Sequence, residues 1–317
     1  MKKLFILAAA AITFAACSND TDKTESATNQ SNIRLMTSVA NVTRSTSQTL
    51  QATQIENGQS VLVELSYDGT ANDADWAAEN KVTENFTADG AGVLNGPTIK
   101  YPVTVAEPGK VVTAKAWAPC STTTAPITWT VQADQTTDAN YIASDFLYGV
   151  TESGYTYTNV VTDGDAVVIK FAHKLSKINV NISSATDENG DPIDPTGASI
   201  VFGPASLNLS GDVSNGNVTA TTTTKGAVTM TSSLETAKTA SAVIIPQTIA
   251  NANAMLTITL GTSVYKYSAP AAGKTFDAGK VYTYTVSLRG DGSIVILNEV
   301  ISDWQTGETE TIVATKE

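Results

Sequence analysis

Apolar and polar residues alternate with a period of two along most of the chain. Clear runs begin at Ile33, Val61, Ala166, Leu256 and Tyr282, and they are rich in Val, Ile, Thr and Tyr. Successive side chains of a β-strand point to opposite faces, so this period indicates strands with one buried face and one face in water. We therefore expect an all-β protein.

Turn dipeptides that tolerate positive φ separate these runs at short intervals. They occur at Asn57-Gly58, Asp68-Gly69, Asp89-Gly90, Asp163-Gly164, Asn189-Gly190, Asn215-Gly216 and Asp291-Gly292. Many short strands joined by such turns predict antiparallel β-sandwiches. Two stretches, 73–80 around Trp76 and 232–240, favour one or two helical turns.

The longest of the alternating runs changes its parity part-way. Its apolar residues have odd numbers from Val167 to Phe171 and even numbers from Ile178 to Ile182. A shift of one residue turns all the following side chains to the other face of a strand. We therefore predict a bulge or kink near His173-Lys174.

A turn at Asp163-Gly164-Asp165 directly precedes the same run. We place a domain boundary there, near residue 162. The prediction is an N-terminal sandwich over 32–162 and a C-terminal sandwich over 163–317, and a chain of 317 residues is long enough for both cores.

The first residues have the pattern of an export signal. A positive start is followed by an apolar stretch from Leu4 to Phe14, too short to span a bilayer, and then by Ala15-Ala16-Cys17. Small residues before a cysteine resemble a bacterial lipobox, which predicts a signal peptide over 1–16 and a lipid on Cys17. The polar stretch 17–31 is then a flexible tether. An ordinary secretory signal cut nearby is the alternative.

The net charge and the number of cysteines limit the possible binding partners and the possible sources of stability. The formal net charge of −12 disfavours nucleic acid and bare anionic membranes as partners. If Cys17 carries a lipid, Cys120 has no intramolecular partner for a disulfide. Stability must then come from packed sheets.

Signals of catalysis or cofactor binding are weak. The single histidine, His173, lies inside the long alternating run, and no G-x-S-x-G sequence accompanies it. We interpret His173 as a structural residue at the predicted kink. No Cys/His cluster for zinc and no glycine-rich phosphate loop occurs in the sequence, so we predict neither an enzyme nor a bound cofactor.

One loop has oxygen ligands of the kind that Ca²⁺ binds, at Asp187, Asn189, Asp191 and Asp194. Its glycine, Gly190, does not take the sixth position that an EF-hand requires. A solvated hairpin loop is the preferred interpretation.

Two aromatic pairs would suit a sugar-binding platform. Tyr155 lies close to Tyr157 in the sequence, and Trp117 lies close to Trp129. Aromatic residues at even spacing on strands more often pack in a core or on a neighbouring strand, which we prefer here.

Several segments, in this order, resemble the fimbrillin family, the type V pilins of Bacteroidetes. They are the lipobox at Cys17, the strand 33–42 followed by Thr43-Arg44-Ser45, Ser144-Asp145-Phe146-Leu147-Tyr148-Gly149, Phe171-Ala172-His173-Lys174-Leu175-Ser176-Lys177-Ile178, and Val300-Ile301-Ser302-Asp303-Trp304. Together they span essentially the whole chain.

This resemblance implies a structural subunit of a surface fimbria that supports adhesion. Such pilins are exported as lipoproteins to the outer membrane and fold as two transthyretin-like β-sandwiches in tandem. An arginine-specific protease cuts after an arginine that follows the first strand, and a C-terminal strand of a neighbouring subunit replaces the strand that leaves. The implied partners are other fimbrial subunits, with tip and anchor subunits among them.

In this sequence Arg44 is the matching arginine and Arg44–Ser45 is the matching bond, whereas Arg34 lies inside the strand pattern. The displaced strand is then the one that carries Ile33, Leu35, Thr37 and Val39. Its loss would expose unpaired N–H and C=O groups beside an apolar groove, and such an edge polymerises unless it is filled.

A donor strand must replace the burial that the first strand provides, roughly 1.5–3 kcal/mol for each large apolar side chain. The β-prone segments near the C-terminus contain the candidate donor residues Ile294, Ile296, Val300, Trp304, Ile312 and Val313. A long β-prone C-terminus favours a stalk subunit over a tip or an anchor.

Two other classes stay open at this stage. A surface glycan-binding lipoprotein would keep its lipid and present an aromatic platform. A secreted hydrolase would need a convergent acid/base site, which the sequence does not show.

We predict that Cys17→Ser abolishes labelling of the protein by a fatty-acid analogue in the producing cell, because the thiol is the proposed site of attachment. Labelling is measured on the immunoprecipitated protein, with Cys120→Ser as the matched control that should stay labelled. Equal labelling of wild type and Cys17→Ser would reject the assignment.

Overall fold

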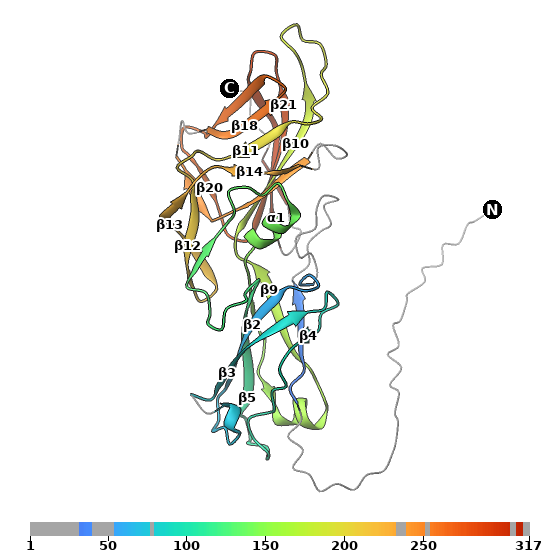
Figure 1. Cartoon of the computed structure of the whole chain (residues 1–317), viewed down its shortest axis with the longest axis vertical. Helices are drawn as coiled ribbons and strands as arrows, with labels where there is room; N and C mark the ends of the chain where they lie inside the picture. Colours follow the sequence, from blue (N-terminus) through green and yellow to red (C-terminus); the bar gives the residue numbers. More distant parts are fainter. Residues whose placement is uncertain are drawn as a thin grey trace, which may run out of the picture.

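The computed structural model of the chain describes residues 32–39, 54–76, 79–232, 239–250, 254–304 and 309–312. These residues form two β-rich units stacked along the long axis of the molecule (Figure 1). Each unit is built around its own cluster of buried hydrophobic residues. Among the described residues, no helix is long and apolar enough to cross a bilayer.

The first unit is one sheet that curls round its core. Its strands are β1 (Leu35–Val39), β2 (Ser60–Tyr67), β3 (Lys81–Ala88), β4 (Leu94–Asn95), β5 (Val111–Ala118), β7 (Leu147–Val150), β8 (Tyr155–Thr156) and β9 (Val167–His173). Their order is β1-β9-β7-β5-β2-β3-β4, with β8 paired to β5. All pairs are antiparallel except β1 with β9, which is parallel.

The second unit packs a large sheet against smaller ones. The large sheet has the order β15-β16-β10-β21-β22-β23. Its strands are β10 (Ser176–Ala185), β15 (Thr231–Ser232), β16 (Thr239–Ile244), β21 (Lys280–Leu288), β22 (Ile294–Asp303) and β23 (Thr309–Ile312). Within it, β10 and β21 are parallel.

The smaller sheets cover the inner face of this large sheet. They are β14-β11-β18-β19, β13-β12-β6 and β17-β20. Their strands are β6 (Thr128–Thr130), β11 (Ser199–Phe202), β12 (Asn208–Ser214), β13 (Asn217–Lys225), β14 (Val228–Thr229), β17 (Gln247–Ile249), β18 (Ala254–Leu260), β19 (Ser263–Ser268) and β20 (Lys274–Phe276). Ile258 and Phe202 pack from these sheets into the same core as Val180 and Tyr284 of the large sheet.

The all-β prediction is confirmed, and so are the strands expected from the alternation. Tyr282, Tyr284, Val286 and Leu288 of β21, for example, are all buried, while the residues between them are half-buried. Six of the seven predicted turn glycines have a positive φ, the exception being Gly69. They are Gly58, Gly90, Gly164, Gly190, Gly216 and Gly292.

The described part of 73–80 forms a short 3₁₀ turn at Trp76, η1 (Ala74–Trp76), which agrees with the expected helical turn. The stretch 232–240 has strand residues of β15 and β16 at its ends, and its middle lies outside the described residues, so a turn there stays a prediction. A second irregular helix, η2 (Thr158–Thr162), and the helix α1 (Asp138–Ser144) were not expected. The hydroxyl of Thr137 accepts the amide N–H of Asn140 and so caps α1.

The predicted change of parity at His173-Lys174 occurs where the chain leaves the first hydrophobic core and enters the second. Val167, Ile169 and Phe171 of β9 are buried in the first core, whereas Ile178 and Val180 of β10 are buried in the second. Strand β9 ends at His173 and β10 begins at Ser176, in a different sheet.

This passage bears on the predicted boundary near residue 162. Because β9 pairs with β7 and β1, the first sheet includes residues beyond that boundary. The turn at residues 163–165 joins two parts of the same unit, and the chain enters the second core only at 174–176. A division into two separately folding domains stays a prediction.

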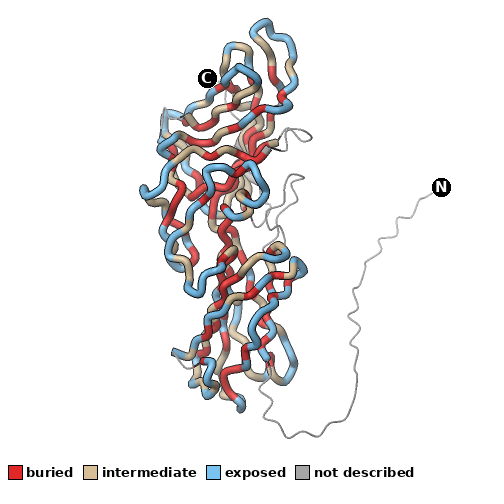
Figure 2. Tube along the Cα trace, viewed as in Figure 1, coloured by how far each residue is buried: buried red, intermediate tan, exposed pale blue. Residues whose placement is uncertain are grey.

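The connection between β5 and β7, two strands of the first unit, packs into the second unit. It leaves the first sheet after Ala118, adds β6 to β12 of the second unit and returns through α1, which packs against β16. The buried side-chain amide of Gln135 donates to the carbonyl of Val243 and accepts its amide N–H, both at 2.8 Å. Buried segments accordingly run through both units (Figure 2).

We predict that Gln135→Ala lowers the free energy of unfolding by about 2–4 kcal/mol, because it leaves the N–H and C=O of Val243 buried without partners. The measurement is denaturant-induced unfolding followed by circular dichroism. Gln132→Ala is the matched control, since the Gln132 side chain is exposed. A similar loss of stability in both variants would contradict this role of Gln135.

Candidate functional site

The predicted first strand, β1, buries one face and exposes the other. Three inward side chains of β1, and that of Ile33 just before it, are each no more than 8% exposed. They are Ile33, Leu35, Thr37 and Val39. Arg34 and Met36 point outward. The alternation therefore predicted the orientation of this strand, including a threonine that shares the buried face.

Strand β1 lies between β9 and the segment 92–100. Along β9 it forms a continuous parallel ladder, in register from Leu35 with Val167 to Val39 with Phe171. Towards 92–100 two backbone hydrogen bonds form, from the amide of Ile33 to the carbonyl of Ile99 at 2.7 Å and from the amide of Thr37 to the carbonyl of Gly92 at 2.8 Å. Strand β1 thus fills a groove whose floor is the first core.

The groove is not completely filled. A half-open cavity of about 260 Å³ lies beside β1, between the two hydrogen bonds to the segment 92–100. Its lining residues come from the start of β1, from Phe86 of β3, from 93–98 and from Ala166.

Of the two arginines considered as processing sites, the structure describes Arg34 but not Arg44. The guanidinium of Arg34 donates to the carbonyl of Gly164, and the carbonyl of Arg34 accepts the amide of Val167 at 2.8 Å. Arg34 is therefore held against this edge of the sheet through both its side chain and its backbone. Arg44, Ser45 and Cys17 lie outside the described residues, and their roles stay predictions.

The candidate donor residues divide into two groups. Ile294 and Trp304 are buried, and Ile296 and Val300 of the same stretch are half-buried. Ile294, Ile296 and Val300 belong to β22, which has β21 on one side and β23 on the other, and Trp304 directly follows β22. Ile312 ends β23, the last strand of the described sheet, and Val313 lies outside the described residues.

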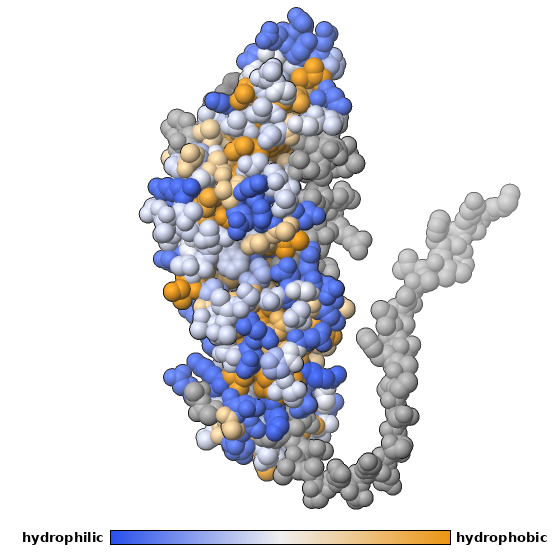
Figure 3. All heavy atoms as spheres, viewed as in Figure 1, coloured by the Kyte–Doolittle hydropathy of each residue, from blue (hydrophilic) through white to orange (hydrophobic). Residues whose placement is uncertain are grey.

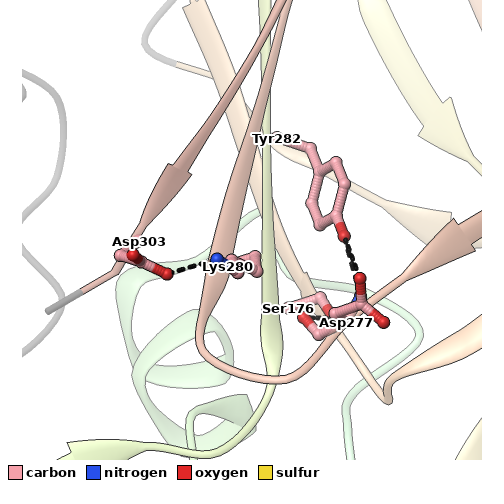
Figure 4. A network of polar contacts seen from close by, with 5 residues as sticks. All are labelled: Ser176, Asp277, Lys280, Tyr282 and Asp303. Carbon is pink, nitrogen blue, oxygen red and sulfur yellow. Dashed lines mark hydrogen bonds and ion pairs between the residues drawn. The ribbon is translucent and has the colours of Figure 1, made fainter. Parts of the chain in front are cut away.

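The end of β22 is held firmly in the second unit. The amide of Trp304 donates to the carbonyl of Gly279 at 2.7 Å, and Asp303 pairs with Lys280 at 2.5 Å. Figure 4 shows this ion pair beside Asp277, whose backbone amide donates to the Tyr282 hydroxyl at 2.8 Å. These contacts tie the end of β22 to the beginning of β21.

A buried polar cluster joins this point to the first unit. The imidazole of His173 stacks on the indole of Trp304 with ring centroids 4.0 Å apart and planes 2° from parallel. Its Nδ1 donates to the carboxylate of Asp145, with oxygens at 2.9 and 3.0 Å, and both side chains are wholly buried. His173 therefore lies at the kink, as predicted, and packs between the two units.

Three segments that carried the resemblance meet in this cluster. Asp145 comes from 144–149, His173 and Lys177 come from 171–178, and Trp304 ends 300–304. Lys177 is also buried, and this burial lowers the pKa of its amine to about 8, although the negative charge of Asp145 opposes the shift. Sequence analysis identified the segments but not their convergence.

The other candidate sites have ordinary structural explanations. The Asp187 carboxylate accepts the amides of Asn189 and Asp191, so the acidic loop is an Asx turn. Among the described residues, no group of three His, Cys, Asp or Glu side chains is placed to hold a metal ion.

The paired aromatics pack inside the protein. Trp117 contacts Tyr148, Trp129 contacts Phe146, and Tyr157 contacts Tyr101, with ring centroids 4.7–5.8 Å apart. Apolar residues on the face shown in Figure 3 lie in several separate groups among polar ones.

Comparison with known families decides the assignment. A model of a family described as fimbrillin-like matches residues 43–304. The chain belongs to the fimbrillin-like family. The resemblance inferred from the sequence segments is therefore confirmed. A search of curated proteins found no match for this fimbrillin-like chain.

Solved structures show the same fold. A proposed cell adhesion protein from Bacteroides uniformis has 19% sequence identity and a TM-score of 0.61, with 86% of this chain and 98% of that chain covered. The tip fimbrial protein Mfa3 from Porphyromonas gingivalis, with a C-terminal truncation, has 13% identity and a TM-score of 0.51, with 86% and 100% covered. Family membership supports a fimbrial or adhesion subunit at the cell surface that interacts with other fimbrial subunits.

We predict that Lys177→Met raises the free energy of unfolding at pH 7 by about 2–3 kcal/mol. The pKa of Lys177 is lowered to about 8 in the folded protein, so the cost of the buried charge is fully present below pH 8. It is relieved as the pH rises towards 10.5, because only the unfolded chain then keeps the proton. The stabilisation should accordingly shrink between pH 8 and 10.5.

The measurement is urea unfolding of wild type and variant across this pH range. Lys115→Met, at an exposed position, is the control and should change stability little at any pH. A gain that does not depend on pH would contradict the buried charge as its cause.

Proposed function

We propose that this fimbrillin-like protein is a stalk subunit of a surface fimbria that is exported as a lipoprotein, cut after Arg44 and polymerised by exchange of β1 for a neighbour's C-terminal strand. The observation that carries the proposal is β1 itself. It is a short strand with one continuous ladder to β9, together with the preceding Ile33 it buries four side chains, and it lies N-terminal to the proposed cut.

The free energy gained by burying β1 is large enough to keep this strand in its groove while the chain is uncut. Burial of Ile33, Leu35 and Val39 contributes roughly 5–9 kcal/mol in total, an upper estimate, before the ladder hydrogen bonds are counted. In the uncut chain β1 is always near its groove, so a neighbour's strand competes poorly. After a cut the freed segment gains translational freedom when it dissociates, and the groove becomes available.

The cut also separates the subunit from its anchor. Cys17 and β1 both precede Arg44 in the sequence, so one cleavage removes the predicted lipid attachment together with the plug. The subunit then leaves the outer membrane for the fimbria in the same step that makes it able to polymerise. An arginine-specific protease is the implied partner.

The contacts of Trp304 support a donor that begins after β22. The end of β22 is fixed by the stack on His173, by the hydrogen bond to Gly279 and by the Asp303–Lys280 ion pair. Strand β23, in contrast, is the last strand of the described sheet. A donor after residue 304 leaves the second core intact.

Repeated exchange builds a filament. The acceptor groove lies in the first unit and the donor lies in the second, so the two interacting surfaces differ. Such heterologous contacts produce open chains rather than closed dimers. Main-chain pairing supplies affinity, and pockets for alternate side chains supply specificity, as in β-strand addition generally.

We predict that Arg44→Lys leaves full-length monomers in the presence of an arginine-specific protease, because the charge is kept but the recognised side chain is lost. Size-exclusion chromatography and N-terminal sequencing measure the outcome, and wild type should begin at Ser45. Arg34→Lys is the matched control and should be cut and polymerise normally. Ordinary polymers of Arg44→Lys would show that the switch is not at this bond.

Deletion of residues 309–317 should leave cleavage at Arg44 unchanged but reduce polymer growth at least tenfold, because β22 and its anchor at Trp304 are retained while the donor is lost. Negative-stain electron microscopy after a fixed time with protease measures polymer length. Polymers of normal length would place the donor upstream, in β22.

A further inference from the structure

Besides Arg44, the chain has two arginines, Arg34 and Arg289, after which the proposed protease could cut. Arg289 lies in the turn between β21 and β22, and its side chain is exposed. Exposed turns are the preferred sites of proteolytic nicking. A cut after Arg289 would break the covalent link between the rest of the subunit and the strands β22 and β23, which follow this turn.

The backbone around Arg289 is held in the turn by hydrogen bonds. The amide of Arg289 donates to the carbonyl of Ser293 at 3.0 Å, and the carbonyl of Arg289 accepts the amide of Gly292 at 2.9 Å. The carbonyl of Leu288 accepts the amide of Thr186 at 3.0 Å. A protease binds its substrate as an extended segment, so these contacts must break before the bond after Arg289 can be cut.

A loop from another part of the chain lies beside this turn. Strands β10 and β21 are parallel, with Ala185 in register with Leu288, so the segments that follow the two strands lie side by side. The segment after β10 is the loop 186–192. Figure 1 shows it in yellow-green at the end of the second unit that points away from the first unit.

The 186–192 loop is pressed directly against the residue that follows Arg289. A Cβ atom added to Gly290 would lie 1.9 Å from the carbonyl oxygen of Asp187 and 2.5 Å from the amide nitrogen of Glu188. Only a glycine therefore lets the two backbones approach this closely. An enzyme cannot enclose the Arg289–Gly290 bond while the loop occupies this position.

One carboxylate gives the loop its shape. Asp187 Oδ1 accepts the backbone amides of Asn189 and Asp191 at 2.8 and 2.9 Å, and the amide of Asp187 donates to the carbonyl of Asp191 at 2.9 Å. An Asx turn of this kind needs an oxygen acceptor but no negative charge, so an asparagine can replace the aspartate. The loop is therefore held in place by its own hydrogen bonds.

Arg34 is held by a different part of the fold. Its carbonyl accepts the amide of Val167, and its guanidinium donates to the carbonyl of Gly164. Both arginines that the structure describes are thus fixed by segments that are distant from them in the sequence.

We propose that the 186–192 loop shields the Arg289–Gly290 bond from an arginine-specific protease, so that processing leaves β22 and β23 attached to the subunit. The proposal rests on the proteolytic processing proposed above and adds a residue, Asp187, that restricts where the protease acts. Cleavage after Arg289 requires the loop to open, and its rate follows the fraction of molecules in which the loop is open.

The test uses Arg44→Lys, in which Arg34 and Arg289 are the only arginines. The full-length protein is incubated with an arginine-specific protease, and mass spectrometry measures the rate at which the fragment 290–317 forms. Asp187→Ala in this background should raise that rate at least tenfold, because the loop loses its acceptor. Asp187→Asn is the matched control and should change the rate less than threefold, since its amide oxygen still accepts both N–H groups.

Gly290→Ala is an independent variant, because its Cβ must displace the loop. It should also raise the rate at least tenfold, after division by the rate for a synthetic peptide of residues 284–295 with the same change. Cleavage after Arg34 reports loss of the whole fold and should stay slow in every variant.

Three results would overturn the shielding by the loop. They are rapid cleavage of the Arg44→Lys protein after Arg289, equal rates for Asp187→Ala and Asp187→Asn, and an equal increase of cleavage after Arg34 and Arg289.

The outcome for wild type separates the two proposals. If wild type is not cut after Arg44, the proposed processing fails whatever happens at Arg289. If wild type is cut after Arg44, and Asp187→Ala resists cleavage after Arg289 as well as Asp187→Asn does, the processing stands and the shielding by the loop is wrong.

Discussion

The free edge of β9 is the constraint on which the rest of the first unit depends. On one side β9 pairs with β7, and on the other side its N–H and C=O groups need a strand. An edge of this kind, beside a groove lined by apolar side chains, invites pairing with another chain. Strand β1 satisfies it from within the same molecule, by pairing in parallel with β9.

Strand β9 also ends at the buried polar cluster that joins the two units. Strand β9 ends at His173, which stacks on Trp304 and donates to Asp145. The end of β22 in the second unit is therefore joined to β9 of the first unit through a few buried contacts.

Burial of polar groups at this junction has a physical cost. Asp145 and Lys177 both lie in a region with little solvent, and burial lowers the pKa of the Lys177 amine although the negative charge of Asp145 opposes the shift. A well-packed apolar cluster would be more stable there. Directional hydrogen bonds and a stacked ring pair, in contrast, restrict how the two units can be oriented at this junction.

Much of the fold was predictable from local pattern, because strands and turns depend on neighbouring residues. The alternation from Ile33 predicted which side chains of β1 are buried, and the change of parity after Phe171 predicted the break at His173. The helix α1 was not expected, since its seven residues have too few turns to show a helical period, and it is stabilised by burial of Tyr141. The boundary near residue 162 relied on a turn that proved to lie within one sheet.

The sequence by itself determined the all-β class, the orientation of β1 and the segments that identify the family. Tertiary structure alone decided the parallel pairing of β1 with β9, the return of 119–146 into the second unit, the meeting of Asp145, His173 and Trp304, and the cavity beside β1. The physical reason is the separation along the sequence over which each kind of interaction acts. Alternation and turn chemistry act between residues a few positions apart, whereas these contacts join residues that are 28 to 132 positions apart and depend on how complete sheets pack.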